Sequence, residues 1–391
     1  MRFEKLPVNP RAAALNHRVE ALANEAVRGL DRVRARLGLR GRAADYDDAH
    51  YEFTGGPSDE LRRKHYDKSL RLLWKAEAAL PWSTFHDMNE AERAMLDAAE
   101  RGLTDVERAA RKRIGTAEFK ALIDREYSDA EKQAIVAILS AIGHGEAYAW
   151  LVSASLLAEV RSTGARAALT MQVMEEAKHF VVLRELVCAF GVPVPRQTAW
   201  EYLLLEGALK ARGLDKFYGM NVLVETIALG IFGLLASLPG LEVLKLFHLD
   251  ESRHTALPGN YFKEFPPSEA ARGSVAGRVR RLAMSLPALP LIMHLEPELA
   301  ELGIDAFDFA GSILRKVANL SERSGFLDDK SARRQLEVFN SIFNAYCRAT
   351  RPGHRWKDFM AADTTRGAEV EATEREIFGD LRSGGRPTAS A

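Results

Sequence analysis

Two short segments of the chain combine acidic residues and histidines at a spacing that could bind metal ions. Glu176 precedes His179 by three residues, and Glu251 precedes His254 by three residues. Residues three apart lie on the same face of an α-helix, so each carboxylate and its imidazole can point at one spot. Carboxylates and imidazoles are ligands that suit first-row transition metals. Two such pairs on two helices predict a site that two metal ions share.

Two further glutamates lie where such a site needs them. Among the 10 histidines, only these two have a Glu three residues before them, and about one such pair would occur by chance. The motifs alone are therefore weak evidence. Glu146 precedes the first motif and Glu225 precedes the second, each within an apolar stretch that reads as a helix. An acid in such a place is costly unless it is paired or binds a metal, and this order of ligands is that of di-iron four-helix bundles.

The pattern resembles the ferritin-like di-iron carboxylate superfamily, which includes ribonucleotide reductase small subunits, bacterial multicomponent monooxygenases, acyl-carrier-protein desaturases and p-aminobenzoate N-oxygenase. The resemblance covers residues from about 128 to 260 and extends to the acids before the motif glutamates, Glu175 and Asp250. It implies six ligands: Glu146, Glu176, His179, Glu225, Glu251 and His254. It also implies that Glu175 and Asp250 each accept a hydrogen bond from the metal-bound His of the other motif, which would fix its tautomer.

His248 is a candidate seventh ligand, because N-oxygenases of the superfamily carry an extra His one turn before the second motif. The spacing to Glu251 is three residues here rather than four, so a packing or hydrogen-bonding role is the alternative. Oxygen chemistry also needs a dry, apolar pocket. The side chains one turn from the ligands are candidates to line it or to belong to the core: Trp150, Leu183, Leu229, Phe247 and Pro258.

Departures from the family patterns narrow the expected chemistry. Leu183 occupies the position of the radical Tyr of ribonucleotide reductase, which argues against that role. Ala149 and Met220 stand where the ligand-binding oxidases form a cross-link between two side chains. Thr226 directly follows Glu225, a step that also resembles p-aminobenzoate N-oxygenase. The resemblance therefore favours an oxygenase or oxidase.

The expected fold is all-α, a ferritin-like four-helix bundle with helical N- and C-terminal extensions. We expect an N-terminal extension over 1–127, the bundle over 128–265, a C-terminal extension over 266–382 and a disordered tail over 383–391. Ser128 and Glu131 form a capping box that begins the first bundle helix. The bundle helices are predicted over 129–160, 165–190 and 214–238 and from 241, with a bridging helix over 197–212. Pro258 and Gly259 are expected to end or kink the fourth helix.

Outside the bundle, helices are predicted over 11–37, 58–80, 89–115, 271–284, 306–320 and 331–348. Composition adds few constraints. The 391 residues carry 54 basic and 54 acidic side chains, a net charge of zero that gives no electrostatic argument for binding nucleic acid or an anionic membrane. Two cysteines do not suggest a disulfide framework, and neither a signal peptide nor a membrane span is apparent. A cytoplasmic protein is expected.

The leading functional hypothesis is an O2-activating, non-haem di-iron oxygenase or oxidase acting on a small, mostly apolar organic substrate by hydroxylation, N-oxygenation or desaturation. Its cofactor would be two iron ions, or manganese and iron, with O2 as co-substrate. Electrons would come from a reductase or ferredoxin, because the chain has no flavin, nucleotide or iron–sulfur motif; a homodimer is one further option. The alternatives are a ferroxidase or iron-handling ferritin-like protein, and a non-catalytic helical interaction protein that binds no metal.

Overall fold

The computed structural model describes residues 5–37, 114, 116–160, 163–268 and 274–361. Within these ranges the structure contains helices and no strand, which confirms the all-α class. The predicted helices over 58–80 and 89–115 and the predicted tail over 383–391 lie outside the described residues. The predicted N-terminal helix is present as α1 (Pro10–Arg36), which the side chain of Asn9 caps.

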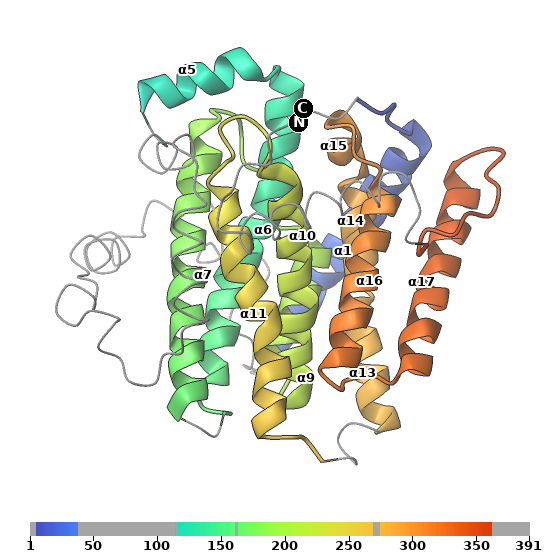
Figure 1. Ribbon diagram of the computed structural model, residues 1–391. Coiled ribbons are helices and arrows are strands. Elements are labelled where there is room, and N and C mark those ends of the chain that lie inside the picture. The colour runs from blue at the N-terminus through green and yellow to red at the C-terminus, as the bar shows by residue number, and fades with distance from the viewer. Residues whose placement is uncertain (1–4, 38–113, 115, 161–162, 269–273, 362–391) are drawn as a thin grey trace, which may run out of the picture.

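Helices α6 (Asp129–Leu156) and α7 (Thr163–Ala189) pack against each other and carry the first three predicted ligands. Both hydrogen bonds of the predicted capping box at Ser128 are present. Helix α7 begins earlier than expected, so Thr163 and Gly164 belong to the helix rather than to a turn. The chain leaves α7 through Gly191, whose φ of 70° lies in the left-handed region that favours glycine. A short helix, α5 (Ala117–Glu126), precedes α6 and lies across one end of these helices (Figure 1).

The predicted third helix is one unbroken helical rod, but its middle part is π-helical, which the sequence did not predict. It consists of α9 (Leu214–Phe217), the π-helical segment η5 (Tyr218–Val224) and α10 (Glu225–Leu235). Within a π-helix each N–H bonds to the carbonyl five residues back, as Glu225 N–H does to Met220. Such segments are rare and often mark functional sites. The bridging helix α8 (Ala199–Lys210) packs beside η5.

The fourth helix, α11 (Leu244–Glu264), corrects one prediction. It runs through Pro258 and continues to Glu264, so of the two expected outcomes at Pro258 and Gly259, a helix end or a kink, the end is wrong. Proline has no backbone N–H and therefore leaves the carbonyl four residues earlier, that of His254, without its helical donor. The side-chain amide of Asn221 on η5 donates to that carbonyl at 3.0 Å. A tertiary contact thus replaces the missing hydrogen bond and allows the helix to continue.

The described residues after α11 contain five helices: α13 (Val275–Ser285), α14 (Ala288–His294), α15 (Glu296–Glu301), α16 (Ala306–Arg323) and α17 (Asp329–Thr350). Helix α14 contacts α8, α16 contacts α10 and α15 contacts α6. They therefore cover one side of the group formed by α6, α7, η5–α10 and α11, and share one hydrophobic core with it (Figure 1).

Two helices, Asp129–Leu156 and Leu214–Leu235, are long and apolar enough to cross a membrane by length and composition alone. Of their most apolar windows, 72% and 100% is buried inside the protein. Their apolar surface is therefore already used in packing against other helices.

Candidate metal centre

Six predicted ligands converge at the centre of the four helices α6, α7, η5–α10 and α11. Their ligand atoms form two groups, within each of which all the atoms lie within 4.8 Å of one another. The first group contains Glu146, Glu176, His179 and Glu251, and the second contains Glu176, Glu225, Glu251 and His254. Glu176 and Glu251 belong to both groups, and both side chains are fully buried. The arrangement offers two adjacent metal positions with two carboxylates able to bridge them.

The two imidazoles present the same ring nitrogen to the carboxylates. Nδ1 of His179 lies 3.1 Å from Glu251 and 3.5 Å from Glu146. Nδ1 of His254 lies 3.0 Å from Glu176 and 3.6 Å from Glu225. Each imidazole therefore points Nδ1 into the carboxylate cluster from its own helix, α7 or α11.

The opposite ring nitrogens contact the two acids that precede the motifs, crossed as the sequence led us to expect. Nε2 of His179 lies 3.1 Å from Asp250, and Nε2 of His254 lies 2.9 Å from Glu175. A carboxylate only accepts hydrogen bonds when ionised, so with a cation in the cluster the proton would stay on Nε2 and the Nδ1 lone pair would face the cation. Arg253 hydrogen bonds to both Asp250 and Glu175 on the outer side of the cluster.

Several polar atoms at the centre make no hydrogen bond of good geometry among the described residues, although some of them lie close to one another. They are both carboxylate oxygens of Glu146, Oε2 of Glu176, Oε1 of Glu251 and Nδ1 of His179. Buried polar atoms are nearly always satisfied in folded proteins. Atoms of this kind, all from carboxylates and an imidazole of the two ligand groups, fit a bound cation.

The cluster contains four carboxylates and two imidazoles, and burial together with their mutual interactions shifts their pKa values. Burial raises the pKa of Glu146 well above its ordinary value, against the opposing effect of His179. Burial, with the added repulsion of Glu251, raises the pKa of Glu225 to about 8. Burial alone would lower the pKa of His179 and His254, but the adjoining carboxylates outweigh it and raise both well above the ordinary value. Without cations the cluster therefore retains protons, and dications would take their place.

The other residues singled out from the sequence lie outside the two groups. His248 is fully buried and places Nδ1 2.9 Å from the carbonyl of Leu229, which matches the hydrogen-bonding alternative rather than a seventh ligand. Burial lowers the pKa of His248 to about 4, which favours the neutral ring. The hydroxyl of Thr226 donates to the carbonyl of Val222 on its own helix. Lys216, a cation on the same helical segment as Glu225, pairs with Glu159.

Two amide side chains that the sequence did not single out join three of the helices behind the second group. Nδ2 of Asn221 donates to Oε1 of Gln172 at 3.0 Å, as well as to the carbonyl of His254. Nε2 of Gln172 in turn donates to Glu225 at 2.9 Å, with a longer contact of 3.4 Å to Glu176. Gln172 and Asn221 each lie four residues before a ligand glutamate in an otherwise apolar stretch, a signal that could have identified them.

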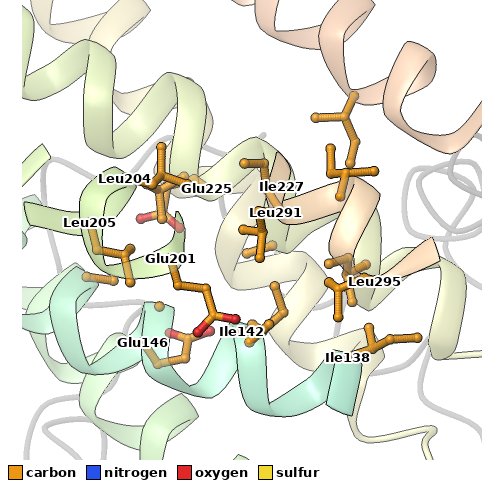
Figure 2. Close-up of a pocket in the computed structure, with 18 of the residues that line it drawn as sticks. Ile138, Ile142, Glu146, Glu201, Leu204, Leu205, Glu225, Ile227, Leu291 and Leu295 are labelled. Carbon is orange, nitrogen blue, oxygen red and sulfur yellow. The ribbon is translucent and has the colours of Figure 1, made fainter. Parts of the chain in front are cut away.

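A small apolar cavity of about 50 Å³ adjoins the cluster. Its wall includes two ligand glutamates, Glu146 and Glu225, and one further acid, Glu201 on α8. Apolar side chains from α6, α8, α10 and the C-terminal helices complete the wall, among them Ile142, Leu205, Leu291, Leu295 and Ile313. Figure 2 shows the three carboxylates gathered on one side of the cavity, with Leu291 and Leu295 on the other.

Of the two alternatives for the side chains one turn from the ligands, the core alternative is confirmed for Leu183, Leu229 and Phe247, which are buried in the core. None of the five side chains proposed to line an apolar pocket, Trp150, Leu183, Leu229, Phe247 and Pro258, belongs to the wall of this cavity. Phe247 instead stacks on the ring of His179, with centroids 4.3 Å apart. The cavity lies on the side that the C-terminal helices cover, and sequence spacing within the bundle could not indicate which side that is.

Glu201 was also missed. Its Oε2 lies 3.0 Å from Nδ1 of His144 and accepts the backbone N–H of Thr198 at 3.1 Å. The side chain also lies in the cavity wall. The carboxylate is thus held at the cavity through contacts to one of its oxygens.

The two cysteines differ in exposure, and neither belongs to the two ligand groups. Cys347 is buried, which raises the pKa of its thiol to about 11, whereas Cys188 is exposed. We expect one thiol per chain to react with a chromogenic disulfide reagent at pH 8 in the folded protein, and two after denaturation in guanidinium, because the thiolate is the reactive form. Since neither cysteine belongs to the two ligand groups, alkylating Cys188 should leave metal content unchanged. Loss of metal on alkylation would contradict this.

Comparisons with models of protein families, with curated protein sequences and with solved structures found no match for this chain. A proposal on function therefore rests on the geometry of the site itself.

Proposed function

We propose that this protein is an O2-activating di-iron oxygenase or oxidase, and that α6, α7, η5–α10 and α11 form a ferritin-like four-helix bundle. The observation that carries the proposal is the pair of buried ligand groups that share Glu176 and Glu251. Four carboxylates and two imidazoles suit iron or manganese, and the lack of a thiolate disfavours a structural zinc site. We propose iron in both positions, with manganese and iron as the alternative pair.

In this proposal each group of residues has a definite task. Glu146 and His179 would hold one ion, Glu225 and His254 the other, and Glu176 and Glu251 would bridge them. Asp250 and Glu175 would hold the imidazoles in orientation through Nε2. When bound, two such ions supply the electrons and coordination positions for reducing O2. The helices keep water away from this chemistry, since every ligand side chain is buried.

The cavity supports an organic substrate rather than iron as cargo. It adjoins Glu146 and Glu225, one from each end of the cluster, and its wall is otherwise apolar apart from Glu201. A hydrated iron ion on its way into a store would need a polar route. An apolar molecule is better matched, and a hydrogen-bond donor on it would meet the carboxylate of Glu201. A cavity of about 50 Å³ holds only a few heavy atoms, so a larger substrate would require the leucine and isoleucine side chains to move.

We further propose that electrons come from a separate reductase or ferredoxin and that the protein acts in the cytoplasm. The first test is elemental analysis of protein expressed with iron and manganese both available, followed by O2-uptake assays with small apolar amines, alcohols and hydrocarbons. About two iron ions per chain and substrate-dependent O2 uptake would support the proposal. Iron uptake far beyond two per chain would instead indicate an iron store. Folded protein with no metal would refute the metal site.

A further inference from the structure

We propose that Asn221 supplies the hydrogen bond that Pro258 removes from α11, and that together with Gln172 it positions the half of the metal site formed by Glu225 and His254. Asn221 and Gln172 would thus be positioning residues, since they act through the ligands. The inference rests on the proposed metal site, but the part that concerns Pro258 can be tested without metal.

The backbone of α11 lacks one helical hydrogen bond at Pro258. In an α-helix the N–H of residue 258 would bond to the carbonyl of residue 254. Pro258 has no N–H, so the carbonyl of the ligand His254 would be buried without a donor. Asn221 is itself fully buried and donates to that carbonyl at 3.0 Å. The backbone at the ligand is therefore tied to η5 on the neighbouring rod instead of to its own helix.

The side-chain amides of Asn221 and Gln172 form a chain of hydrogen bonds that runs in one direction. A backbone carbonyl only accepts, so the NH2 group of Asn221 must face His254. That NH2 group also meets Gln172 at 3.0 Å, so Gln172 must present its oxygen there. The NH2 group of Gln172 then faces the carboxylate of Glu225 at 2.9 Å. Pro258 leaves the carbonyl of His254 without its helical donor, and this carbonyl can only accept. It therefore sets the orientation of both amides. The chain of hydrogen bonds ends on the carboxylate of Glu225.

The amides of Asn221 and Gln172 contact the two proposed metal positions unequally. The amide chain reaches Glu225 and the backbone of His254, which belong to the second group, and Glu176, which belongs to both. No hydrogen bond from either amide reaches Glu146 or His179 among the described residues. Breaking the chain should therefore weaken one metal position much more than the other.

The test is a cycle of four proteins: wild type, Asn221→Leu, Pro258→Ala and the double variant. Residue 258 regains its N–H in Pro258→Ala, so the carbonyl of His254 no longer depends on Asn221. In metal-free protein we expect Asn221→Leu to lower Tm by about 4 °C when Pro258 is present, and by clearly less when it is combined with Pro258→Ala. Equal losses in the two backgrounds would overturn the proposed replacement of the Pro258 hydrogen bond.

Metal binding gives the second readout. Asn221→Leu should weaken the affinity of one of the two positions by about 10-fold or more, with the other little changed, as for other groups that orient metal ligands. Asn344→Leu is the matched control, because Asn344 is another buried Asn that donates to backbone carbonyls, those of Asn340 and Lys357, in α17 and the segment after it. It should lower Tm without altering metal affinity, and Pro258→Ala should not rescue it.

The outcomes separate the two proposals. If wild type binds two ions and Asn221→Leu binds them with unchanged affinities, the positioning role is wrong while the metal site stands. If Asn344→Leu weakens metal as much as Asn221→Leu does, the effect is general destabilisation and the positioning role is again wrong. If wild type binds no metal, the proposed function fails, and the Tm cycle still decides whether Asn221 replaces the hydrogen bond lost at Pro258.

Discussion

Replacing Glu176 by Gln is expected to abolish binding at both metal positions while the protein remains folded. Glu176 belongs to both ligand groups, so one substitution removes a charged ligand from each ion. Metal content should fall from about two ions per chain to well below one. The measurement is elemental analysis after gel filtration, alongside circular dichroism to confirm that the protein is helical.

The same variant should change stability little when metal is absent. In metal-free protein the cluster retains protons, so Glu176 repels the other carboxylates but attracts His254, whose Nδ1 lies 3.0 Å away. Because these effects oppose each other, the Tm of metal-free protein should change by no more than about 2–4 °C. Added iron should then raise the Tm of wild type but not that of the variant, because a ligand that binds only the folded state stabilises it.

A matched control is Glu185→Gln, also on α7 but exposed and paired only with the neighbouring Arg184 among the described residues. It should bind metal as wild type does. Two tightly bound ions in Glu176→Gln, or a collapse of the metal-free variant, would contradict the arrangement described above.

The second large effect is expected from the acids behind the imidazoles. Asp250→Asn removes the charge that holds Nε2 of His179 at 3.1 Å, and should reduce metal affinity at that position by about 10–100-fold. The interaction with His179 is strong: although burial would raise the pKa of Asp250, the His179 contact outweighs it and holds that pKa well below its usual range. Competitive titration of metal-free protein with a chromogenic chelator measures the loss.

Glu175→Gln provides the counterpart on the other side. Its carboxylate contacts Nε2 of His254 at 2.9 Å, so the weakened position should be the one that His254 and Glu225 hold. The two single variants should therefore each leave one ion tightly bound, and the double variant should leave none. If either single variant keeps both affinities, the crossed contacts have no part in holding metal.

The convergence of the six candidate ligands could be predicted from the sequence because it depends on local rules. Glu and His three residues apart share a helix face wherever the helix is placed, and Glu146 and Glu225 were conspicuous as acids within apolar stretches. The capping box at Ser128 likewise depends on a few neighbouring residues. The structure brings the six side chains together and contains both hydrogen bonds of the capping box.

What could not be predicted depends on contacts between distant segments. Pro258 alone indicates a helix end, and only Asn221, which lies on another helix, explains why α11 continues. The π segment before Glu225 leaves no periodic signal in a stretch that is apolar on every side. The position of the cavity follows from which face α14, α16 and α8 cover, so Glu201 could be recognised only once those helices were placed.

The complete burial of the ligands has a consequence for the rate of metal exchange. All six ligand side chains are at most 3% exposed, and they come from four packed helices. An ion from solution can reach them only when the helices separate locally, and such openings are slow compared with diffusion. Uptake by metal-free protein should therefore become independent of iron concentration once opening limits it. The same barrier would retain the ions for long periods even when a strong chelator is present.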